Sequence, residues 1–186
     1  MHDVETHGGL RLAHRIATRD DIPAIMTLIE AAIVGNMAAF LSPREVEAAR
    51  ATMGLDTLLI EDGCYFLIES NGSLVGCGGW SRRKTLYGGD RTAGRDDSLS
   101  DPARDPARIR AMYTHPAWTR RGVGSMLLAL GEAAARAEGF RTIELGATLP
   151  GEPLYKACGY REFGRVETIG ADGVRNVIVK MRKSLR

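Results

Sequence analysis

The sequence has 186 residues, of which 44% are hydrophobic and 26% charged, as in an ordinary globular domain. Its formal net charge of +2 is too small to indicate a nucleic-acid partner, and no apolar run approaches the length of a membrane span. Three separated cysteines, four scattered histidines and an N-terminus without a leader pattern predict no disulfide framework, no metal site, no membrane partner and a cytoplasmic location.

The N-terminal half is predicted to contain a strand, two helices and a β-hairpin. Ser42 and Glu45 have the spacing of a capping box, which opens the second helix. Asn71 and Gly72 form the strongest short hairpin signal. From periodicity, alternation and these signals, the expected elements are a strand at 15–17, helices at 20–34 and 42–52, and hairpin strands at 64–70 and 74–81.

The C-terminal half begins with residues 84–107, which are rich in Gly, Asp, Arg and Pro and show no periodicity. We expect a long mobile loop there. Gly139 is expected just past the end of the longest helix. The elements that follow the loop are a strand at 109–114, a helix from 123, a strand at 142–147, a short helix at 152–158 and strands at 160–168 and 174–181. Together these elements predict one α/β domain with a mixed sheet, in which residues 1–10 are flexible.

The turn between the strand at 109–114 and the following helix indicates an anion site. It contains Arg120, Arg121, Gly122, Val123 and Gly124. The first turn of a helix exposes unpaired backbone N–H groups at its positive end, and glycine lets a phosphate approach because no Cβ fills the space. The turn therefore predicts phosphate binding, although an ordinary glycine-rich helix start has the same composition.

Two common phosphate loops do not match this turn. A P-loop requires a Lys-Ser or Lys-Thr pair after its glycines, and no such pair follows Gly122 and Gly124. A dinucleotide-binding turn requires a third glycine, where this chain has Leu127. A third pattern, Gln/Arg-x-x-Gly-x-Gly/Ala, matches residues 119–124 except at its first position, which is Thr119. It is the pyrophosphate loop of the GNAT acetyltransferases.

Other segments resemble the same family in the same order. Thr114-His115-Pro116 resembles the tripeptide that ends the strand before the loop, and residues 155–160 resemble the Tyr-x-x-x-Gly-Phe/Tyr segment. Residues 76–80, GCGGW, resemble the family's hairpin strand. The chain thus resembles a GNAT acetyltransferase over residues 15–181. That resemblance implies a single α/β domain spanning 1–186, with a mixed, mostly antiparallel sheet flanked by helices.

The resemblance also implies a cosubstrate. GNAT enzymes transfer an acetyl group from acetyl-CoA, and we expect the acceptor to be a primary amine of a small molecule or peptide. The pantetheine arm is expected along Met112 and Thr114, with the N–H near Met112 polarising the thioester carbonyl. The phosphates are expected on the other residues of the binding turn, which are Arg120, Arg121, Gly122, Val123, Gly124 and Ser125.

Tyr155 matches the family's general-acid position. A tyrosine with a pKa near 10 can protonate the leaving thiolate of a thiol with a pKa near 8.5, and its place in the motif favours this role over that of a core aromatic. The base stays unassigned, because Arg108 stands where many members have glutamate. Glu144 is as readily a solvated strand residue, and His115 is better read as part of a turn. The missing base weakly favours an acceptor less basic than lysine.

The resemblance implies an acceptor cleft between the first helix pair and its connection, the hairpin strands and the loop before the last strand. Residues 36–41, residues 80–83 and part of 84–107 are therefore expected to line it. Phe40 and Trp80 are candidate apolar walls, together with Tyr87. Arg82 and its neighbour Arg83 are candidate partners for a carboxylate or phosphate, or else exposed charges on a strand end. We therefore expect an acceptor that carries a negative group as well as an amine.

Two other functions stay open at this stage. One is a catalytically silent acyl-CoA-binding sensor or interaction module of the same fold. The other is a phosphate-binding fold for another ligand, such as a nucleotide. A homodimer through the closing strands is also open, and no nucleic-acid partner is expected.

Overall fold

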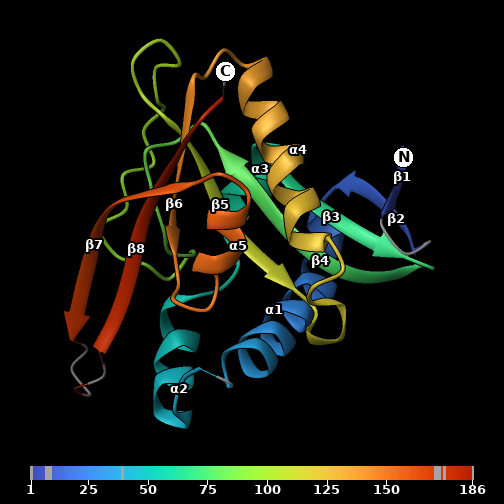
Figure 1. Cartoon of the computed structure of the whole chain (residues 1–186), viewed down its shortest axis with the longest axis horizontal. Coiled ribbons are helices and arrows are strands. Elements are labelled where there is room, and N and C mark those ends of the chain that lie inside the picture. Colours follow the sequence, from blue (N-terminus) through green and yellow to red (C-terminus); the bar gives the residue numbers. More distant parts are fainter. Residues whose placement is uncertain (1, 7–9, 39, 170–172, 174, 186) are drawn as a thin grey trace.

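A computed structural model of the chain describes residues 2–6, 10–38, 40–169, 173 and 175–185. The elements are, in chain order (Figure 1), β1 His2–Thr6, β2 Leu10–Ile16, η1 Arg19–Asp21, α1 Ile22–Met37, α2 Pro43–Thr52, α3 Thr57–Glu61, β3 Tyr65–Ser70, β4 Ser73–Ser81, β5 Ala107–Thr114, η2 Pro116–Trp118, α4 Val123–Ala137, β6 Thr142–Ala147, α5 Glu152–Ala157, β7 Arg161–Ile169 and β8 Arg175–Ser184.

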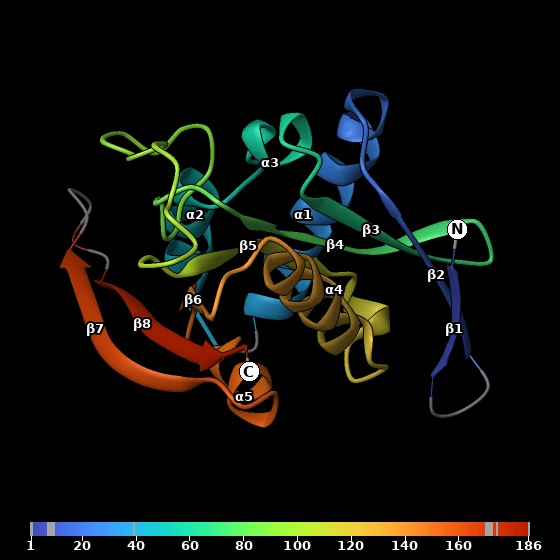
Figure 2. The ribbon, with the colours of Figure 1, turned by 90° about the horizontal axis from the view of Figure 1, so that it is seen from above.

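The strands form one eight-stranded sheet in the order β1-β2-β3-β4-β5-β6-β8-β7. All neighbouring strands are antiparallel except β5 and β6, which are parallel. One core cluster joins α4 and α5 to one face, and a second joins α1, α2 and α3 to the other (Figure 2). The predicted α/β domain with a mixed, mostly antiparallel sheet flanked by helices is confirmed.

Several local predictions are confirmed by backbone geometry. Ser42 and Glu45 form the capping box at the start of α2. Asn71 and Gly72 both have positive φ, +49° and +76°, as the tight turn between β3 and β4 requires. Gly139 follows α4 with φ of +90°.

Two elements are not foreseen. The five-residue helix α3 is too short for its periodicity to be recognised. β1 pairs with β2 inside the N-terminal segment that is expected to be flexible. Residues 1 and 7–9 of that segment lie outside the described part of the chain, and its flexibility stays a prediction. Among the described residues, no helix combines the length and apolar character needed to cross a membrane.

The long segment between β4 and β5 carries no helix or strand at residues 82–106 apart from a bridge between Arg83 and Leu99. It is nevertheless tied to the sheet. The guanidinium of Arg110 on β5 donates to the carbonyl oxygens of Thr85 and Gly88, at 3.0 and 2.5 Å. The mobility of this loop stays a prediction, but these bonds fix where it crosses the molecule.

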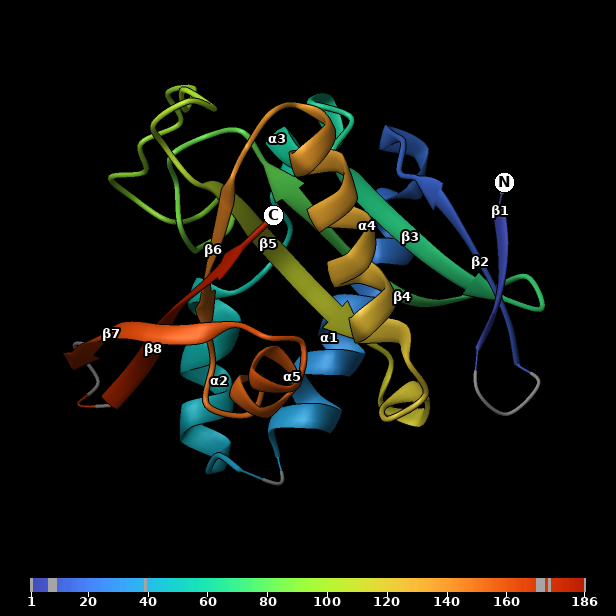
Figure 3. The same cartoon turned by 45° about the horizontal axis from the view of Figure 1, so that its top comes forward.

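The sheet is interrupted between β5 and β6. These strands pair only at Ala107 with Ile143 and Arg108 with Glu144, and they then diverge toward α5 (Figure 3). Ala111, on the diverging part, has φ of +50°, and the register between β4 and β5 shifts beside it. A left-handed alanine is uncommon and marks a bulge that redirects the strand. The second half of β5 therefore has no strand partner on its β6 side.

Candidate active site

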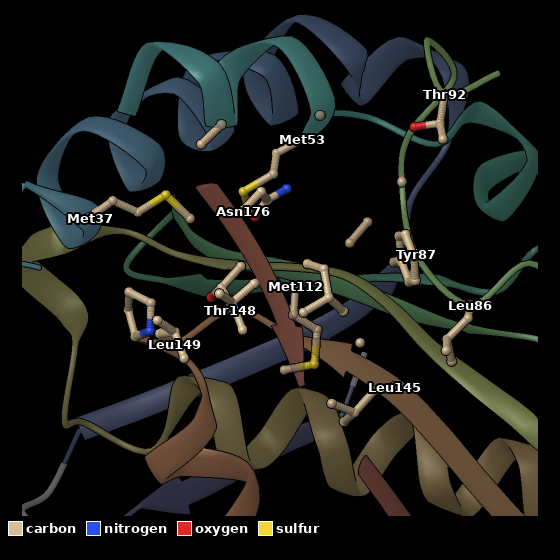
Figure 4. A pocket seen from close by; sticks show the side chains of 18 of the residues that line it. Met37, Met53, Leu86, Tyr87, Thr92, Met112, Leu145, Thr148, Leu149 and Asn176 are labelled. Carbon is tan, nitrogen blue, oxygen red and sulfur yellow. The ribbon is translucent and has the colours of Figure 1, made fainter. Parts of the chain in front are cut away.

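A cavity of about 530 Å³ lies where β5 and β6 separate (Figure 4). This volume is typical of a small-molecule site. Its walls come from residues 109–113 of β5, Leu145 and Gly146 of β6, side chains of α1 and α2, residues 86–88 and 91–93 of the long loop and residues 175–178 of β8. Residues 53 and 54, residues 148–150, Val166 of β7 and Tyr155 of α5 also line it.

Tyr155 faces this cavity with an unused hydroxyl. The side chain is half-buried, and burial raises the pKa of its phenol to about 12. Its ring meets Tyr160 edge-on, with centroids 6.1 Å apart. No hydrogen bond of the hydroxyl to any described residue is present. At neutral pH the phenol is therefore protonated and available as a donor into the cavity.

α5 reaches this position because Gly124 lets it approach α4. A Cβ at Gly124 would lie 2.7 Å from Cδ2 of Leu154, closer than atoms in contact can lie. On the next turn of α5, Sγ of Cys158 is 3.8 Å from Oγ of Ser125. The glycine turn, α5 and the cavity are therefore consecutive neighbours in space.

The glycine turn itself has the expected backbone. Gly122 precedes the 15-residue helix α4 with φ of +85°, and Arg120 is left-handed at +62°. Arg120, Arg121 and Ser125 are exposed, and neither arginine has an acidic partner in the described part of the chain. The guanidinium of Arg121 lies 5.2 Å from the ring centre of Trp118. An exposed, positively charged helix start is available here for an anion.

The two predicted strand residues occupy different environments. The Met112 side chain lines the cavity beside Leu145 of β6 (Figure 4). Met112 belongs to the part of β5 that no longer pairs with β6. Thr114 does not line the cavity, and its carbonyl accepts a hydrogen bond of 2.7 Å from Nδ2 of Asn36 on α1. This bond ties α1 to the free edge of β5.

The residues considered as bases do not face the cavity. The buried carboxylate of Glu144 is held between the guanidinium groups of Arg108 and Arg182. Nδ1 of His115 accepts a hydrogen bond of 3.2 Å from the backbone N–H of Ala117, which caps η2. Glu144 therefore joins strands, and His115 holds a turn.

Charged side chains of the described cavity lining are Glu45, Arg91, Arg110 and Arg175. The Glu45 carboxylate accepts hydrogen bonds from the backbone N–H and hydroxyl of Ser42, at 2.8 and 2.7 Å. These bonds lower the pKa of Glu45. The carboxylate is thus a helix cap and a weak base.

The structure does not bring the three expected acceptor residues to the cavity. Trp80 is 2% exposed and lies in the core on the α4 side of the sheet, edge-on to Phe140. Arg82 follows on the same side and pairs with Glu138 at 2.5 Å. Phe40 is 68% exposed, away from the cavity. The opposite face of the sheet, toward α1 and α2, supplies the lining instead.

Residues that sequence reasoning missed come from the loop and from β8. Arg91 and Thr92 reach the cavity because Arg110 and Asp56 hold the loop against the sheet. Asn176 reaches it from β8 (Figure 4). Contacts between such distant segments leave no local pattern in a single sequence. Tyr87, named beforehand as a wall, does line the cavity.

Comparisons with known proteins show the family and agree with the fold. A family model described as the acetyltransferase (GNAT) family matches residues 33–160. The search of curated proteins gives no match.

Three solved structures illustrate the similarity of fold. A GCN5-related N-acetyltransferase from Rhodopseudomonas palustris has 20% identity and a TM-score of 0.68, covering 99% of this chain and 98% of its own. The PaiA N-acetyltransferase from Thermoplasma acidophilum, in complex with coenzyme A, has 12% identity and a TM-score of 0.62, covering 93% and 98%. The ribosomal-protein-S18-alanine N-acetyltransferase from Escherichia coli has 16% identity and a TM-score of 0.58, covering 94% of each chain.

Proposed function

Since the chain belongs to the acetyltransferase (GNAT) family and is an acyltransferase, we propose that it moves an acetyl group from acetyl-CoA directly to an amine of a small molecule or peptide. The observation that carries the proposal is the cavity at the break between β5 and β6. It brings together the part of β5 that does not pair with β6 and Tyr155, whose hydroxyl makes no hydrogen bond to a described residue.

The residues present fit coenzyme A. Backbone N–H groups of residues 121–125 and the side chains of Arg120 and Arg121 would hold its phosphates at the start of α4. The pantetheine arm would lie along the backbone of Met112 and Thr114, because β6 no longer pairs with this part of β5. The N–H of Met112 would donate to the thioester oxygen, where negative charge develops during transfer.

Acetyl-CoA supplies an activated acetyl group as a thioester. Transfer forms a bond between the acceptor nitrogen and the acetyl carbon and breaks the carbon–sulfur bond. Tyr155 donates a hydrogen bond to the departing sulfur. Because the pKa of its phenol is about 12, complete loss of its proton to a thiolate of pKa near 8.5 is unfavourable unless it regains the proton that the amine releases. The products are the amide and the free thiol.

No unengaged carboxylate or imidazole lines the cavity within the described residues, so the acceptor must deliver a neutral amine. A lysine side chain is neutral in roughly one molecule in 2,500 at pH 7. An α-amine with a pKa near 8 is neutral in roughly one in ten. The site therefore favours an acceptor whose amine is less basic than that of lysine.

The test combines binding with turnover. The purified chain is titrated with acetyl-CoA and, separately, with ATP by calorimetry, and thiol release is then followed with a panel of amino acids, peptides and polyamines. We expect acetyl-CoA but not ATP to bind, and thiol release to depend on an amine. Binding without release for every amine would leave a silent acyl-CoA-binding module. Failure to bind acetyl-CoA would overturn the proposal.

A further inference from the structure

One of the charged side chains in the cavity wall has no partner. The only carboxylate of the described lining is engaged in the cap of α2. The guanidinium of Arg110 donates to Asp56 at 2.8 Å, and that of Arg175 donates to Glu167 at 3.0 Å. Arg91 has neither a hydrogen bond nor an ion pair with any described residue. Arg91 is therefore the one charged side chain of the described cavity lining that has no hydrogen-bond or ion-pair partner.

The backbone that carries Arg91 is fixed on both sides. The carbonyl oxygen of Gly88 accepts from Arg110, and the carboxylate of Asp90 accepts from the N–H and hydroxyl of Thr57, at 2.9 and 3.1 Å. The N–H of Asp90 also donates to the Leu55 carbonyl at 3.0 Å. These contacts hold the segment that carries Arg91 at the cavity wall.

Contacts within the turn at residues 88–92 also hold its shape. Gly88 has φ of +98°, and a Cβ there would lie 2.3 Å from the Thr92 hydroxyl oxygen. That hydroxyl accepts a hydrogen bond of 3.1 Å from the N–H of Gly89. Unpaired arginines are common on exposed surfaces. This one differs because hydrogen bonds hold the turn that carries it and because Arg91 lines the proposed active-site cavity.

The rest of the acceptor side is largely apolar. Met37 and Met53 point into it from α1 and from the end of α2, and Tyr87 faces them from the loop (Figure 4). Asn176 of β8 adds an amide that has no hydrogen bond to a described residue. An apolar compartment with one free cation at its margin suits a ligand that has an apolar body and a negative end.

We propose that the acceptor is an amine that also bears an anionic group, a carboxylate or a phosphate, and that Arg91 binds this group. The inference rests on the proposed acetyl transfer and names its substrate class. The amine lies near Tyr155, and the apolar part of the acceptor occupies the space beside Met37 and Met53. Arg91 is a specificity-determining residue in this arrangement, since it selects among amines without taking part in the transfer itself.

The experiment compares acceptors that differ only in the negative group. Amino acids with apolar side chains are paired with their amides, and aminoalkyl phosphates with the corresponding amino alcohols. Binding is measured by calorimetry to protein saturated with coenzyme A, and kcat and KM are measured separately with acetyl-CoA. The variants are Arg91→Ala, Arg91→Lys and the control Arg104→Ala. Arg104 belongs to the same loop, has an 86% exposed side chain and lies outside the cavity lining.

The wild-type protein is expected to bind the anionic member of a pair more tightly. Arg91→Ala should weaken that binding about 10- to 100-fold and raise KM with little change in kcat, because a charge-assisted contact is lost. Arg91→Lys should restore part of the loss, neutral partners should be unaffected, and Arg104→Ala should behave as wild type. Tighter binding of the amino acids would identify the anionic group as a carboxylate, and tighter binding of the aminoalkyl phosphates would identify it as a phosphate.

Equal binding of both members of every pair, or an equal effect of Arg91→Ala on both, would overturn the inference. Turnover of neutral amines as efficient as that of their anionic partners, with intact acetyl-CoA binding, would leave the proposed transfer standing and remove only the anionic acceptor. Loss of acetyl-CoA binding by the wild-type chain would instead remove the proposed function.

Discussion

Tyr155 combines three properties that determine what it can do. It lines the cavity, its hydroxyl makes no hydrogen bond within the described part of the chain, and burial raises its pKa to about 12. Replacing it with phenylalanine keeps the ring and its contact with Tyr160 but removes the donor. We expect Tyr155→Phe to lower kcat by about 100-fold or more while the Kd for acetyl-CoA stays the same. Steady-state kinetics and calorimetry measure the two quantities, and unchanged turnover would exclude Tyr155 from the transfer.

The pH profile tests the protonation state of the same residue. The proposed transfer uses the protonated phenol, and because its pKa is raised to about 12, Tyr155 stays protonated from roughly pH 6 to 9. Over that interval kcat/KM should rise as the acceptor amine loses its proton. Acceptors of lower amine pKa should shift the profile to lower pH. A fall in kcat/KM that starts near pH 8 for every acceptor would contradict a raised phenol pKa.

Gly79 on β4 illustrates a residue required by close packing. A Cβ there would lie 2.4 Å from the carbonyl oxygen of Cys64, which is backbone and cannot turn aside. Gly79→Ala should lower the free energy of unfolding by about 1–3 kcal/mol. Gly54→Ala is the control, because a Cβ at Gly54 meets nothing within 4 Å, and it should change stability little. Urea denaturation compares the two, and equal stabilities would show that the strands can move apart.

Residue roles were predictable where a local rule applies. The start of α4 follows from Gly122 and Gly124 because helix ends and close approaches depend on nearby sequence. Trp80 and Arg82 were misplaced because the side of the sheet that a strand residue occupies depends on register, which a single sequence does not define. Arg91 could not be found for a different reason, since its position depends on contacts from α3 and β5.

At the scale of elements, a buried ion network fixes the long loop. The guanidinium of Arg95 donates to both carboxylate oxygens of Asp56, at 3.1 and 3.2 Å, and Arg110 binds the same carboxylate. The side chains of Arg110 and Asp56 are 2% and 1% exposed. Removing one member of a buried network leaves charge without compensation, which costs far more than loss of an exposed pair.

Arg95→Ala should therefore lower the free energy of unfolding by about 3 kcal/mol and speed hydrogen exchange across residues 82–106. Arg104→Ala, in the same loop but exposed, should stay within about 0.5 kcal/mol of wild type. Urea denaturation and hydrogen exchange followed by mass spectrometry measure both effects. If hydrogen exchange across residues 82–106 were unchanged in Arg95→Ala, Arg110 alone would be sufficient to anchor the loop.

Element positions were largely predictable, and the exceptions share a cause. Capping by Ser42, the turn at Asn71 and Gly72 and the periodicity of α4 are short-range features, and each gave the correct element. The pairing of β1, the existence of α3 and the path of residues 82–106 depend on contacts made only after folding. No spacing in the chain indicates the break between β5 and β6.

At the scale of the molecule, the sheet consists of two parts with a narrow junction. β5 and β6 share two residue pairs, and the carboxylate of Glu144 links Arg108 on β5 with Arg182 on β8 beside them. Beyond the pair formed by Arg108 and Glu144, the two strands separate around the cavity. The start of α4 and the end of α5 meet beside this gap. A ligand that lies in the gap with its phosphates on α4 would contact both parts and should stabilise the whole fold.

A negative charge added at the start of α4 separates ligand binding from the stability of the ligand-free protein. Ser125 is exposed in the first turn, where an added carboxylate favours the helix by about 0.3–1 kcal/mol but repels phosphate. Ser125→Glu should therefore keep or raise the Tm of the free protein. Acetyl-CoA at 100 times its Kd should stabilise the wild type by about 2.7 kcal/mol, and this shift should be lost in the variant at the same concentration.

Ala129→Glu places the same charge on an exposed position one turn further along α4 and should retain the shift, as should Ser125→Ala. Thermal unfolding with and without acetyl-CoA distinguishes the variants, and a full shift in Ser125→Glu would mean that the phosphates bind elsewhere on the fold.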